Sequence, residues 1–403
     1  MIFFKSQCNI NGNLLMFKRI LDMSLPKGQS AFVWGARKTG KSTYLKAHFT
    51  HSICYDLLKT DILMRFITSP FLLREEILAL PEAKKQLPVI IDEVQKIPAL
   101  LDEVHWLIEN EHIQFILCGS SARKLKRAGA NLLGGRAWRY HFYPLLYSEI
   151  PEFDLLRALN HGLVPSHYLS SHPQKSLEAY VADYLAEEIQ NEGLVQNLPK
   201  FAHFLDSMGF NNGEMIVYSN IASDCGVDSK TVQAYFQILV DTLLGYYVLP
   251  YHKKVGRDII VKTPKFYLFD VGVATYLRRI TINELKGAEA GHAFEHYIFM
   301  ELIAYSHFSE KKFEINYWRT KSGLEVDFVL SRGDIAIEVK IHQQVQKIDL
   351  KGLLAFIEEH HPKKAIVVSQ DPTARLIKLA NGNSIMIKPW REFLKDLWAG
   401  NIC

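Results

Sequence analysis

Eight consecutive residues near the N-terminus have the spacing G-x-x-x-x-G-K-S: Gly35, Ala36, Arg37, Lys38, Thr39, Gly40, Lys41 and Ser42. The two glycines let the backbone curl so that its N–H groups point at phosphate oxygens. Lys41 supplies a positive charge for the β- and γ-phosphates, and the hydroxyl of Ser42 is a ligand for Mg²⁺. This P-loop spacing predicts that residues 35–42, with Thr43 at the start of the following helix, bind ATP and Mg²⁺.

An apolar segment further along the chain, 87–91, runs into Asp92 and Glu93. Beside a P-loop, Asp92 would hold Mg²⁺ directly or through water, and Glu93 would orient and polarise the attacking water. An acidic turn at the end of an ordinary strand is the simpler explanation. Because the pair follows a P-loop, we predict hydrolysis of ATP as well as binding.

Polar residues also follow a third apolar segment, 112–118. Ser120 and Ser121 can sense the γ-phosphate, or cap a helix that begins at Ala122, or do both. Further on, Arg136 follows two glycines. It could reach a phosphate of its own subunit, reach a phosphate of a neighbouring subunit, or lie on the surface, and the sequence leaves all three open.

These segments, in this order, resemble the AAA-type branch of P-loop ATPases. The chain is most similar to a prokaryotic group that fuses such an ATPase to a C-terminal restriction-endonuclease-like region, the PD-(D/E)xK type. That group is an ATP-binding protein family with a C-terminal domain of unknown function. The resemblance implies an α/β chain with a parallel ASCE/AAA-type sheet, a helical lid, a winged helix and an α/β C-terminal domain. It also implies a homo-oligomer.

The middle of the chain is expected to be helical, with amphipathic helices over 177–192 and near 201–208 as the lid. Residues 218–228 predict a short helix, a glycine turn and an N-cap at Asp228. A helix over 229–240 and a strand over 246–249 then complete a helix-turn-helix with the start of a wing. The helix has a polar outward face, and the wing carries a set of cations that suits phosphate contacts: Lys253, Lys254, Arg257 and Lys262. A purely structural spacer is the alternative.

Two alternating segments near the C-terminus, 324–330 and 335–340, predict a hairpin with its turn at 331–334. On this register Asp327 lies opposite Glu338. Facing carboxylates repel each other unless a cation lies between them, so we predict that this pair holds Mg²⁺. The alternation also places one set of residues together on the core face of the first strand: Leu324, Val326, Phe328 and Leu330.

The same register places Glu325 opposite Lys340. Lys340 could stabilise developing negative charge or help to position water. This D…E-x-K pattern resembles that of restriction-endonuclease-like nucleases, which also carry a carboxylate on a preceding helix, where Glu295 fits. Two alternatives stay open. The hairpin could be exposed, with a surface Glu325–Lys340 pair, or the fold could be inherited with a metal site that no longer cleaves.

Composition sets the remaining limits on function. The chain has 403 residues, is 48% hydrophobic and has a formal net charge of +4, so nucleic acid binding through a local patch is permitted but not required. Five cysteines without a C-x-x-C spacing predict neither a disulfide framework nor a zinc site, which suits the cytoplasm. Because no apolar run approaches about 18–20 residues, we expect no membrane span.

We therefore expect four parts: an AAA-type ATPase domain (1–150), a helical lid or connector (151–208), a winged helix-turn-helix (209–262) and a restriction-endonuclease-like domain (263–403). The favoured hypothesis is an ATP-hydrolysing protein that acts on nucleic acid, DNA in preference to RNA, with ATP gating a Mg²⁺-dependent nuclease. The alternative is a nucleotide-switched DNA-binding or regulatory ATPase whose nuclease-like domain is a non-cleaving interaction platform. An ATPase acting on protein partners is the least favoured.

Overall fold

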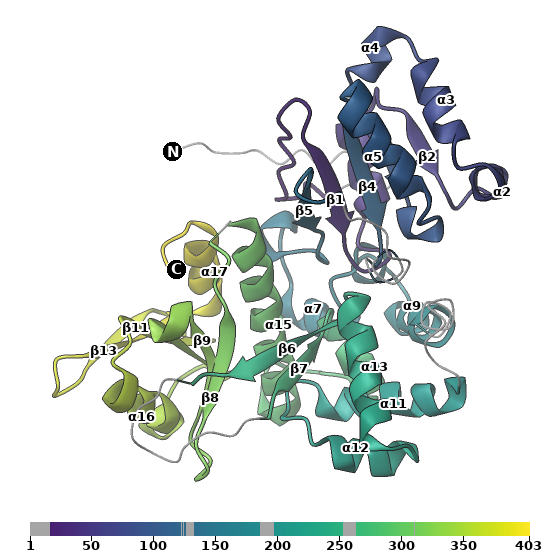
Figure 1. Cartoon of the computed structure of the whole chain (residues 1–403). Helices are drawn as coiled ribbons and strands as arrows, with labels where there is room; N and C mark the ends of the chain where they lie inside the picture. The colour runs from purple at the N-terminus through teal and green to yellow at the C-terminus, as the bar shows by residue number, and fades with distance from the viewer. Residues whose placement is uncertain are drawn as a thin grey trace.

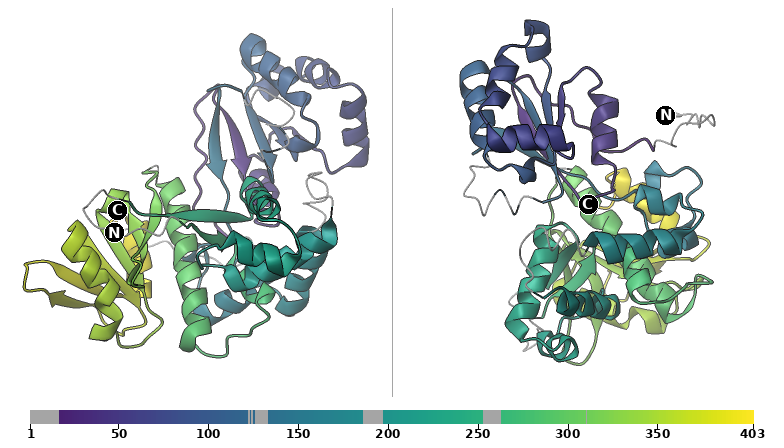
Figure 2. Two further views of the ribbon diagram at one scale, coloured as in Figure 1. Left: turned by 60° about the horizontal axis from the view of Figure 1, so that its bottom comes forward. Right: turned by 90° about the vertical axis from the view of Figure 1, so that its right-hand side faces the viewer.

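The computed structural model describes residues 17–121, 123, 125, 133–185, 197–252, 263–309 and 311–403. In Figure 1 the N-terminal strands and helices, drawn in purple and blue, form one lobe, and the rest of the chain forms a second, longer lobe. The two further views in Figure 2 show the same division. Within the described part of the chain, no helix combines the length and the apolar composition needed to span a membrane.

The N-terminal lobe is built on a parallel five-stranded sheet in the order β2-β3-β4-β1-β5. Its central strands are buried along their whole length because helices cover both faces. The strands are β1 (Ser30–Trp34), β2 (Cys54–Asp56), β3 (Val89–Asp92), β4 (Phe115–Gly119) and β5 (Ala137–His141). The helices are α1 (Lys41–His48), α2 (Thr60–Thr68), α3 (Leu72–Leu78), α4 (Glu82–Lys85), η1 (Val94–Lys96) and α5 (Leu100–Glu111).

The strand order brings the two predicted nucleotide motifs together. Since all five strands are parallel, their carboxyl ends lie at one edge of the sheet, where ligands of open α/β sheets bind. The P-loop follows β1, and the acidic pair lies at the end of β3. Only β4 separates these two strands, so Ser120, at the end of β4, lies between the motifs.

A helical region joins the lobes. It contains η2 (Tyr147–Glu149), α7 (Leu155–His161), α8 (Pro165–Tyr168), α9 (Pro173–Ala179), the π-helical η3 (Tyr180–Leu185), α11 (Leu198–Asn211), α12 (Tyr218–Cys225) and α13 (Ser229–Asp241). Residues 186–192 of the predicted lid helix lie outside the described residues. The predicted helix-turn-helix is present: the side chain of Asp228 accepts hydrogen bonds from Lys230 N and Thr231 N, and Gly226 has the left-handed φ of 62° that ends α12.

The C-terminal sheet has eight strands in the order β12-β13-β11-β10-β9-β8-β6-β7. They are β6 (Gly245–Pro250), β7 (Lys265–Leu268), β8 (Ile315–Arg319), β9 (Glu325–Leu330), β10 (Ile335–Val339), β11 (Lys364–Ser369), β12 (Arg375–Lys378) and β13 (Ser384–Pro389). The helical elements of this region are α14 (Val271–Leu277), α15 (Gly287–Phe308), η4 (Ser331–Gly333), η5 (Lys347–Leu350), α16 (Lys351–His360) and α17 (Trp390–Trp398). Helices α15 and α17 pack on one face of the sheet and α16 on the other.

The helix-turn-helix and the C-terminal sheet are physically continuous. Strand β6 pairs with β7 and also, in parallel, with β8. Phe266 and Leu268 of β7 pack in one cluster with Phe236 of α13 and Val273 of α14. The expected domain break between residues 262 and 263 therefore does not coincide with a break in packing. The four-part division stays a prediction.

Candidate functional site

The P-loop encloses the side chain of its own lysine. Lys41 is 5% exposed, and its Nζ donates hydrogen bonds to the carbonyl oxygens of Gly35, at 2.7 Å, and Ala36, at 2.9 Å. Gly40 has a φ of 102° and Lys38 a φ of 58°, the turn that the glycine spacing predicts. Ser42 and Thr43 lie in the first turn of α1, whose N-terminal end favours an anion.

Two residues that sequence reasoning missed, Phe142 and Arg19, support this loop. A Cβ on Gly35 would lie 2.2 Å from the carbonyl oxygen of Phe142, so only glycine fits there. Arg19 donates to Thr39 O at 2.8 Å and to Tyr143 O at 2.6 Å, and it pairs with Glu149 at 2.9 Å. Arg19 precedes β1 without a recognisable motif, so nothing in the sequence signals that it braces the P-loop.

The acidic pair is buried and faces the P-loop. Asp92 is 3% and Glu93 is 7% exposed, and Asp92 Oδ1 accepts a hydrogen bond from Glu93 N at 3.1 Å. Burial raises the pKa of Glu93, and the positive charges of Lys41 and Arg37 oppose that rise. The structure therefore brings the predicted base and the predicted phosphate ligands into one electrostatic environment.

Gln95 links this pair to the end of β4 and was also missed. Its Nε2 donates to Glu93 Oε2 at 2.5 Å and to Ser120 Oγ at 3.1 Å. A Cβ on Gly119 would lie 2.3 Å from Gln95 Oε1, so the glycine makes room for the amide. Ser120 thus lies where a γ-phosphate sensor is expected, one side chain away from Glu93.

Ser121 points to the other lobe. Its Oγ accepts from Arg123 N at 3.1 Å, as a helix cap would, and donates to the carbonyl oxygen of Asp241 at 3.1 Å. Arg123 forms an ion pair of 2.7 Å with the Asp241 carboxylate. Asp241 is the last residue of α13, so the end of β4 contacts the second helix of the helix-turn-helix. Most of the helix expected after Ser121 lies outside the described residues.

Arg136 does not lie near the nucleotide site of its own subunit. It directly precedes Ala137, which pairs with Ser30 at the start of β1, and it forms an ion pair with Glu109 on α5. The P-loop lies at the opposite end of β1, roughly 13–16 Å away for a five-residue strand. In this structure Arg136 is therefore distant from the P-loop of its own subunit. Its contact with a phosphate, of its own or of a neighbouring subunit, stays a prediction.

The C-terminal hairpin has the predicted register up to Phe328, because Leu330 faces Ile335, Val329 faces Ala336 and Phe328 faces Ile337. Beyond that pair the strands are no longer paired, and the Asp327 carboxylate lies close enough to Glu338 for the two charges to interact. The predicted Glu325–Lys340 pair is wrong, because Glu325 pairs with Lys265 and Arg319. Asp327 is 7% and Glu338 is 5% exposed. Asp327 Oδ2 accepts from Val339 N at 2.7 Å, and Lys340 Nζ lies 2.5 Å from Glu338 Oε1.

Another detail of the hairpin was predicted wrongly. Val326 packs in the cluster that contains α16, whereas Phe328 and Leu330 pack in the cluster that contains α15. The register between β8 and β9 shifts between Asn316 and Trp318, so the strict alternation breaks at Asp327. A β-bulge of this kind redirects the side chain at which it occurs. Here that residue is Asp327, a predicted cation ligand.

The two facing carboxyl groups are electrostatically strained. Burial, followed by the charge of Glu338, raises the pKa of Asp327 well above its usual range, and burial also raises the pKa of Glu338. Burial alone would lower the pKa of Lys340, but the carboxylates of Asp327 and Glu338 outweigh it, so that pKa is raised. Among the described residues, no hydrogen-bond donor reaches Glu338 Oε2.

This donor set fits a single Mg²⁺. Within the part of the chain that the structure describes, no group of three or more His, Cys, Asp and Glu side chains forms a ready-made metal cage. Mg²⁺ does not need one, because it keeps several waters and binds through one or two carboxylates. A buried oxygen without a donor, beside a second carboxylate, provides that kind of ligand.

Glu295 lies in α15, as predicted, and its carboxylate has its own partners. Lys265 Nζ lies 3.3 Å and the hydroxyl of Tyr267 lies 2.5 Å from Glu295 Oε1. Burial would raise the pKa of Glu295, but Lys265 and Tyr267 outweigh it and lower the pKa. Lys265 was missed, although a lysine within the apolar segment 265–269 signals a buried cation that needs a partner.

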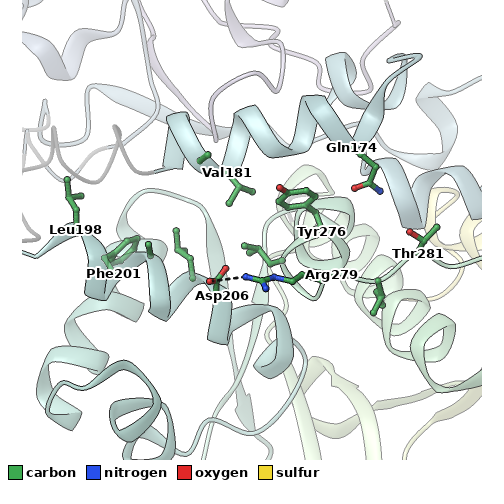
Figure 3. Close-up of a pocket in the computed structure, with 13 residues that line it drawn as sticks. Gln174, Val181, Leu198, Phe201, Asp206, Tyr276, Arg279 and Thr281 are labelled. Carbon is green, nitrogen blue, oxygen red and sulfur yellow. Dashed lines mark hydrogen bonds and ion pairs between the residues drawn. The ribbon is translucent and has the colours of Figure 1, made fainter.

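One cavity lies away from both of these sites. It has a volume of about 590 Å³ and lies between the α9–η3 segment, α11 and α14, where Arg279 pairs with Asp206 at 3.4 Å (Figure 3). Of the described residues that line it, none is a predicted site residue. Neither the P-loop nor the C-terminal hairpin contributes to this cavity.

Comparisons with protein families divide the chain into three matched segments. Residues 27–151 match the AAA domain. These residues form an AAA-type P-loop ATPase domain. Residues 152–284 match a domain of unknown function (DUF8612), and residues 290–388 match another (DUF4143). The AAA part of the predicted resemblance is confirmed, whereas the nuclease-like part stays a prediction. No curated protein gives a significant match.

Two solved structures are distantly similar. The Aeropyrum pernix Orc1 protein in complex with DNA is 13% identical, with a TM-score of 0.26, over 62% of this chain and 86% of that chain. A Pyrococcus horikoshii signal transduction ATPase with numerous domains, which carries a tetratricopeptide repeat sensor, is 14% identical with a TM-score of 0.20. That match covers 71% of this chain and 46% of the other. At these TM-scores neither similarity supports a conclusion about this chain.

Proposed function

We propose that this protein is an ATP-hydrolysing, nucleic-acid-processing enzyme in which the nucleotide state of the AAA domain controls a Mg²⁺-dependent nuclease site in the C-terminal sheet. One observation carries the nuclease part: Asp327 and Glu338 lie buried on neighbouring strands beside Lys340, and one oxygen of Glu338 has no donor among the residues that the structure describes. The matched AAA domain supports the ATPase part. DNA is the favoured nucleic acid, and the cytoplasm is the proposed location.

ATP hydrolysis would use the residues at the carboxyl edge of the first sheet. Lys41 would leave the loop carbonyls and bind the β- and γ-phosphates, and Ser42 and Asp92 would hold Mg²⁺. Glu93 would accept a proton from the attacking water, for which its raised pKa suits it. Ser120 would report the γ-phosphate through Gln95, which bridges Ser120 and Glu93.

The order of elements in the C-terminal region supports a nuclease fold. Helix α15 precedes three antiparallel strands, β8, β9 and β10, and α16 then crosses to β11, which is parallel to β10. Restriction-endonuclease-like enzymes place their acidic residues on such a core. Bound Mg²⁺ would polarise the scissile phosphate. Asp327 and Glu338 would hold it, and the Lys340 ammonium would stabilise negative charge on the phosphate.

A direct contact supports control by ATP. The end of β4 is followed by Ser120, which Gln95 links to Glu93, and by Ser121, which binds Asp241 of α13. A shift of β4 on nucleotide binding would therefore move α13. The exposed residues of α13 are Lys230, Gln233, Ala234 and Gln237, three of which are polar. The predicted wing cations, Lys253, Lys254, Arg257 and Lys262, lie outside the described residues.

The decisive experiment separates the two activities. Purified protein with Mg²⁺ and ATP should release phosphate, and it should nick plasmid or branched DNA. Asp327→Asn and Lys340→Ala should lose nicking but keep phosphate release, whereas Glu314→Gln, which changes an exposed carboxylate, should keep both. If the unchanged protein binds DNA in a nucleotide-dependent way but never cleaves it, the nuclease part is wrong. The protein is then a nucleotide-switched binding protein.

A further inference from the structure

Lys265 is a buried cation in the β6–β7 hairpin, which follows the helix-turn-helix. Its side chain reaches a group of carboxylates in the C-terminal sheet and α15, called here the acidic site: Glu295, Glu325, Asp327 and Glu338. Lys265 begins β7, is 4% exposed, and lies 5.5 Å from the centre of the Tyr317 ring. Its Nζ is 2.5 Å from Glu325 Oε1 and 3.3 Å from Glu295 Oε1. A single ammonium group thus bridges two carboxylates from two different elements.

Both carboxylates have a second partner as well. The Tyr267 hydroxyl donates to Glu295, and Arg319 Nη1 lies 2.8 Å from Glu325 Oε2. The neighbouring pair differs: Asp327 accepts from Val339 N, Glu338 pairs with Lys340, and Glu338 Oε2 has no donor among the described residues. The four carboxylates therefore divide into a pair satisfied by the chain and a pair that is not.

The charges divide in the same way. Around Glu295 and Glu325, the cations Lys265 and Arg319 balance two negative charges. Around Asp327 and Glu338, the one ion pair among the described residues joins Lys340 to Glu338, and Lys265 acts on Asp327 only through its charge, without an ion pair. Buried carboxylates without a counter-charge are costly, so the unbalanced pair favours a cation. Glu295 and Glu325 already have a bridging cation, the Lys265 ammonium group, which joins them as a second divalent ion joins carboxylates in two-metal sites.

We propose that Lys265 takes the place of a second divalent cation, so that the acidic site binds one ion, between Asp327 and Glu338. This inference rests on the cation site of the proposed function. Glu295 and Glu325 are then partners of Lys265 and not metal ligands. The site is also completed by a strand from outside the segment that matches DUF4143, because Lys265 lies within residues 152–284.

The test is a calorimetric titration of the full-length, nucleotide-free protein with Mn²⁺. Electron paramagnetic resonance gives a second measurement of the number of ions bound per chain. The unchanged protein should bind one Mn²⁺ per chain at this site. Lys265→Met should bind two, and Lys265→Met/Glu325→Gln should return to one. Lys265→Arg keeps the charge and should bind one, as should Lys351→Met, which removes an exposed lysine. A Lys265→Met protein that binds a single ion with unchanged affinity overturns the proposal.

A second set of variants keeps the inference falsifiable if Lys265→Met does not fold. Glu295→Gln and Glu325→Gln should each leave the number of bound ions and their affinity unchanged, because neither residue is a ligand. Loss of the ion in either variant overturns the proposal. Asp327→Asn should abolish binding. If it does not, the assigned cation site is wrong, whereas a second ion gained by Lys265→Met and lost with Glu325→Gln would still support the role of Lys265.

Discussion

The hydroxyl of Ser121 donates a hydrogen bond to the main-chain oxygen of Asp241, 3.1 Å away. The two residues are separated by 120 positions and belong to different lobes. Ser121 directly follows Ser120, the γ-phosphate sensor candidate at the end of β4. Asp241 is the last residue of helix α13. The contact gives the nucleotide site a route to the helix-turn-helix that does not pass through the P-loop.

Breaking this contact should uncouple DNA binding from nucleotide state. We expect Arg123→Ala, alone or with Ser121→Ala, to retain ATP binding while the ratio of DNA affinities with and without an ATP analogue falls by about fivefold. The ion pair is partly exposed, so the change in stability should be about 1 kcal/mol or less. Fluorescence anisotropy measures the affinities. Arg139→Ala, at an exposed position of β5, is the control and should keep the full ratio.

Lys41 and Glu93 should separate binding from hydrolysis. Lys41→Ala removes the charge that faces the phosphates, so a fluorescent ATP analogue should bind much more weakly. Glu93→Gln should bind the analogue normally, while kcat falls by about 10²–10⁴-fold because the proton acceptor is lost. Equal loss of binding in both variants would contradict the separate roles. Thermal melting checks that both proteins are folded.

Arg136 should act only between subunits. Because it lies at the opposite edge of the sheet from its own P-loop, we expect Arg136→Ala to bind ATP normally but to lose about 10³-fold in hydrolysis. Mixing Arg136→Ala with Lys41→Ala should restore part of the rate, since each protein supplies what the other lacks. No recovery in a mixture shown to co-assemble would indicate that Arg136 serves only its ion pair with Glu109.

Cation affinity at the hairpin should fall as the pH is lowered. A carboxyl group must lose its proton to bind a metal ion, and the pKa values of Asp327 and Glu338 are raised, first by burial. The fall should therefore begin closer to neutrality than the pKa of about 4 of an ordinary carboxyl group suggests. Mn²⁺ titrations between about pH 5 and pH 8 test this.

The same shifts predict opposite stability trends with and without the ion. In metal-free protein the folded state holds these protons more tightly than the unfolded state does. The stability that the protonated Asp327 and Glu338 contribute is thus complete below the pKa values of these groups in the unfolded chain. It is lost as the pH rises through their raised pKa values in the folded protein. Added Mn²⁺ should reverse the trend, because it binds the deprotonated folded form. Identical melting curves with and without Mn²⁺ at about pH 8 would contradict the prediction.

The sequence was sufficient for the features that depend on local pattern. The P-loop, the acidic strand end, the cap at Asp228 and the hairpin register each rest on short-range spacing, which backbone geometry translates directly. The features that it missed depend on contacts between distant segments. Arg19, Gln95 and Lys265 have partners that only the folded chain brings near, and the bulge at Asp327 depends on the neighbouring strand β8.

The pairing of β6 with both β7 and β8 bears on how such a chain can be rearranged during evolution or in the laboratory. A C-terminal module that is cut out at residue 290, where the DUF4143 match begins, leaves behind the β6–β7 hairpin, which extends its sheet. It also leaves behind Lys265, which balances the charges of Glu295 and Glu325. The excised module would expose the open edge of β8, and an exposed edge is prone to aggregation. Exchange of C-terminal modules between relatives should therefore succeed only when the hairpin is transferred with its sheet.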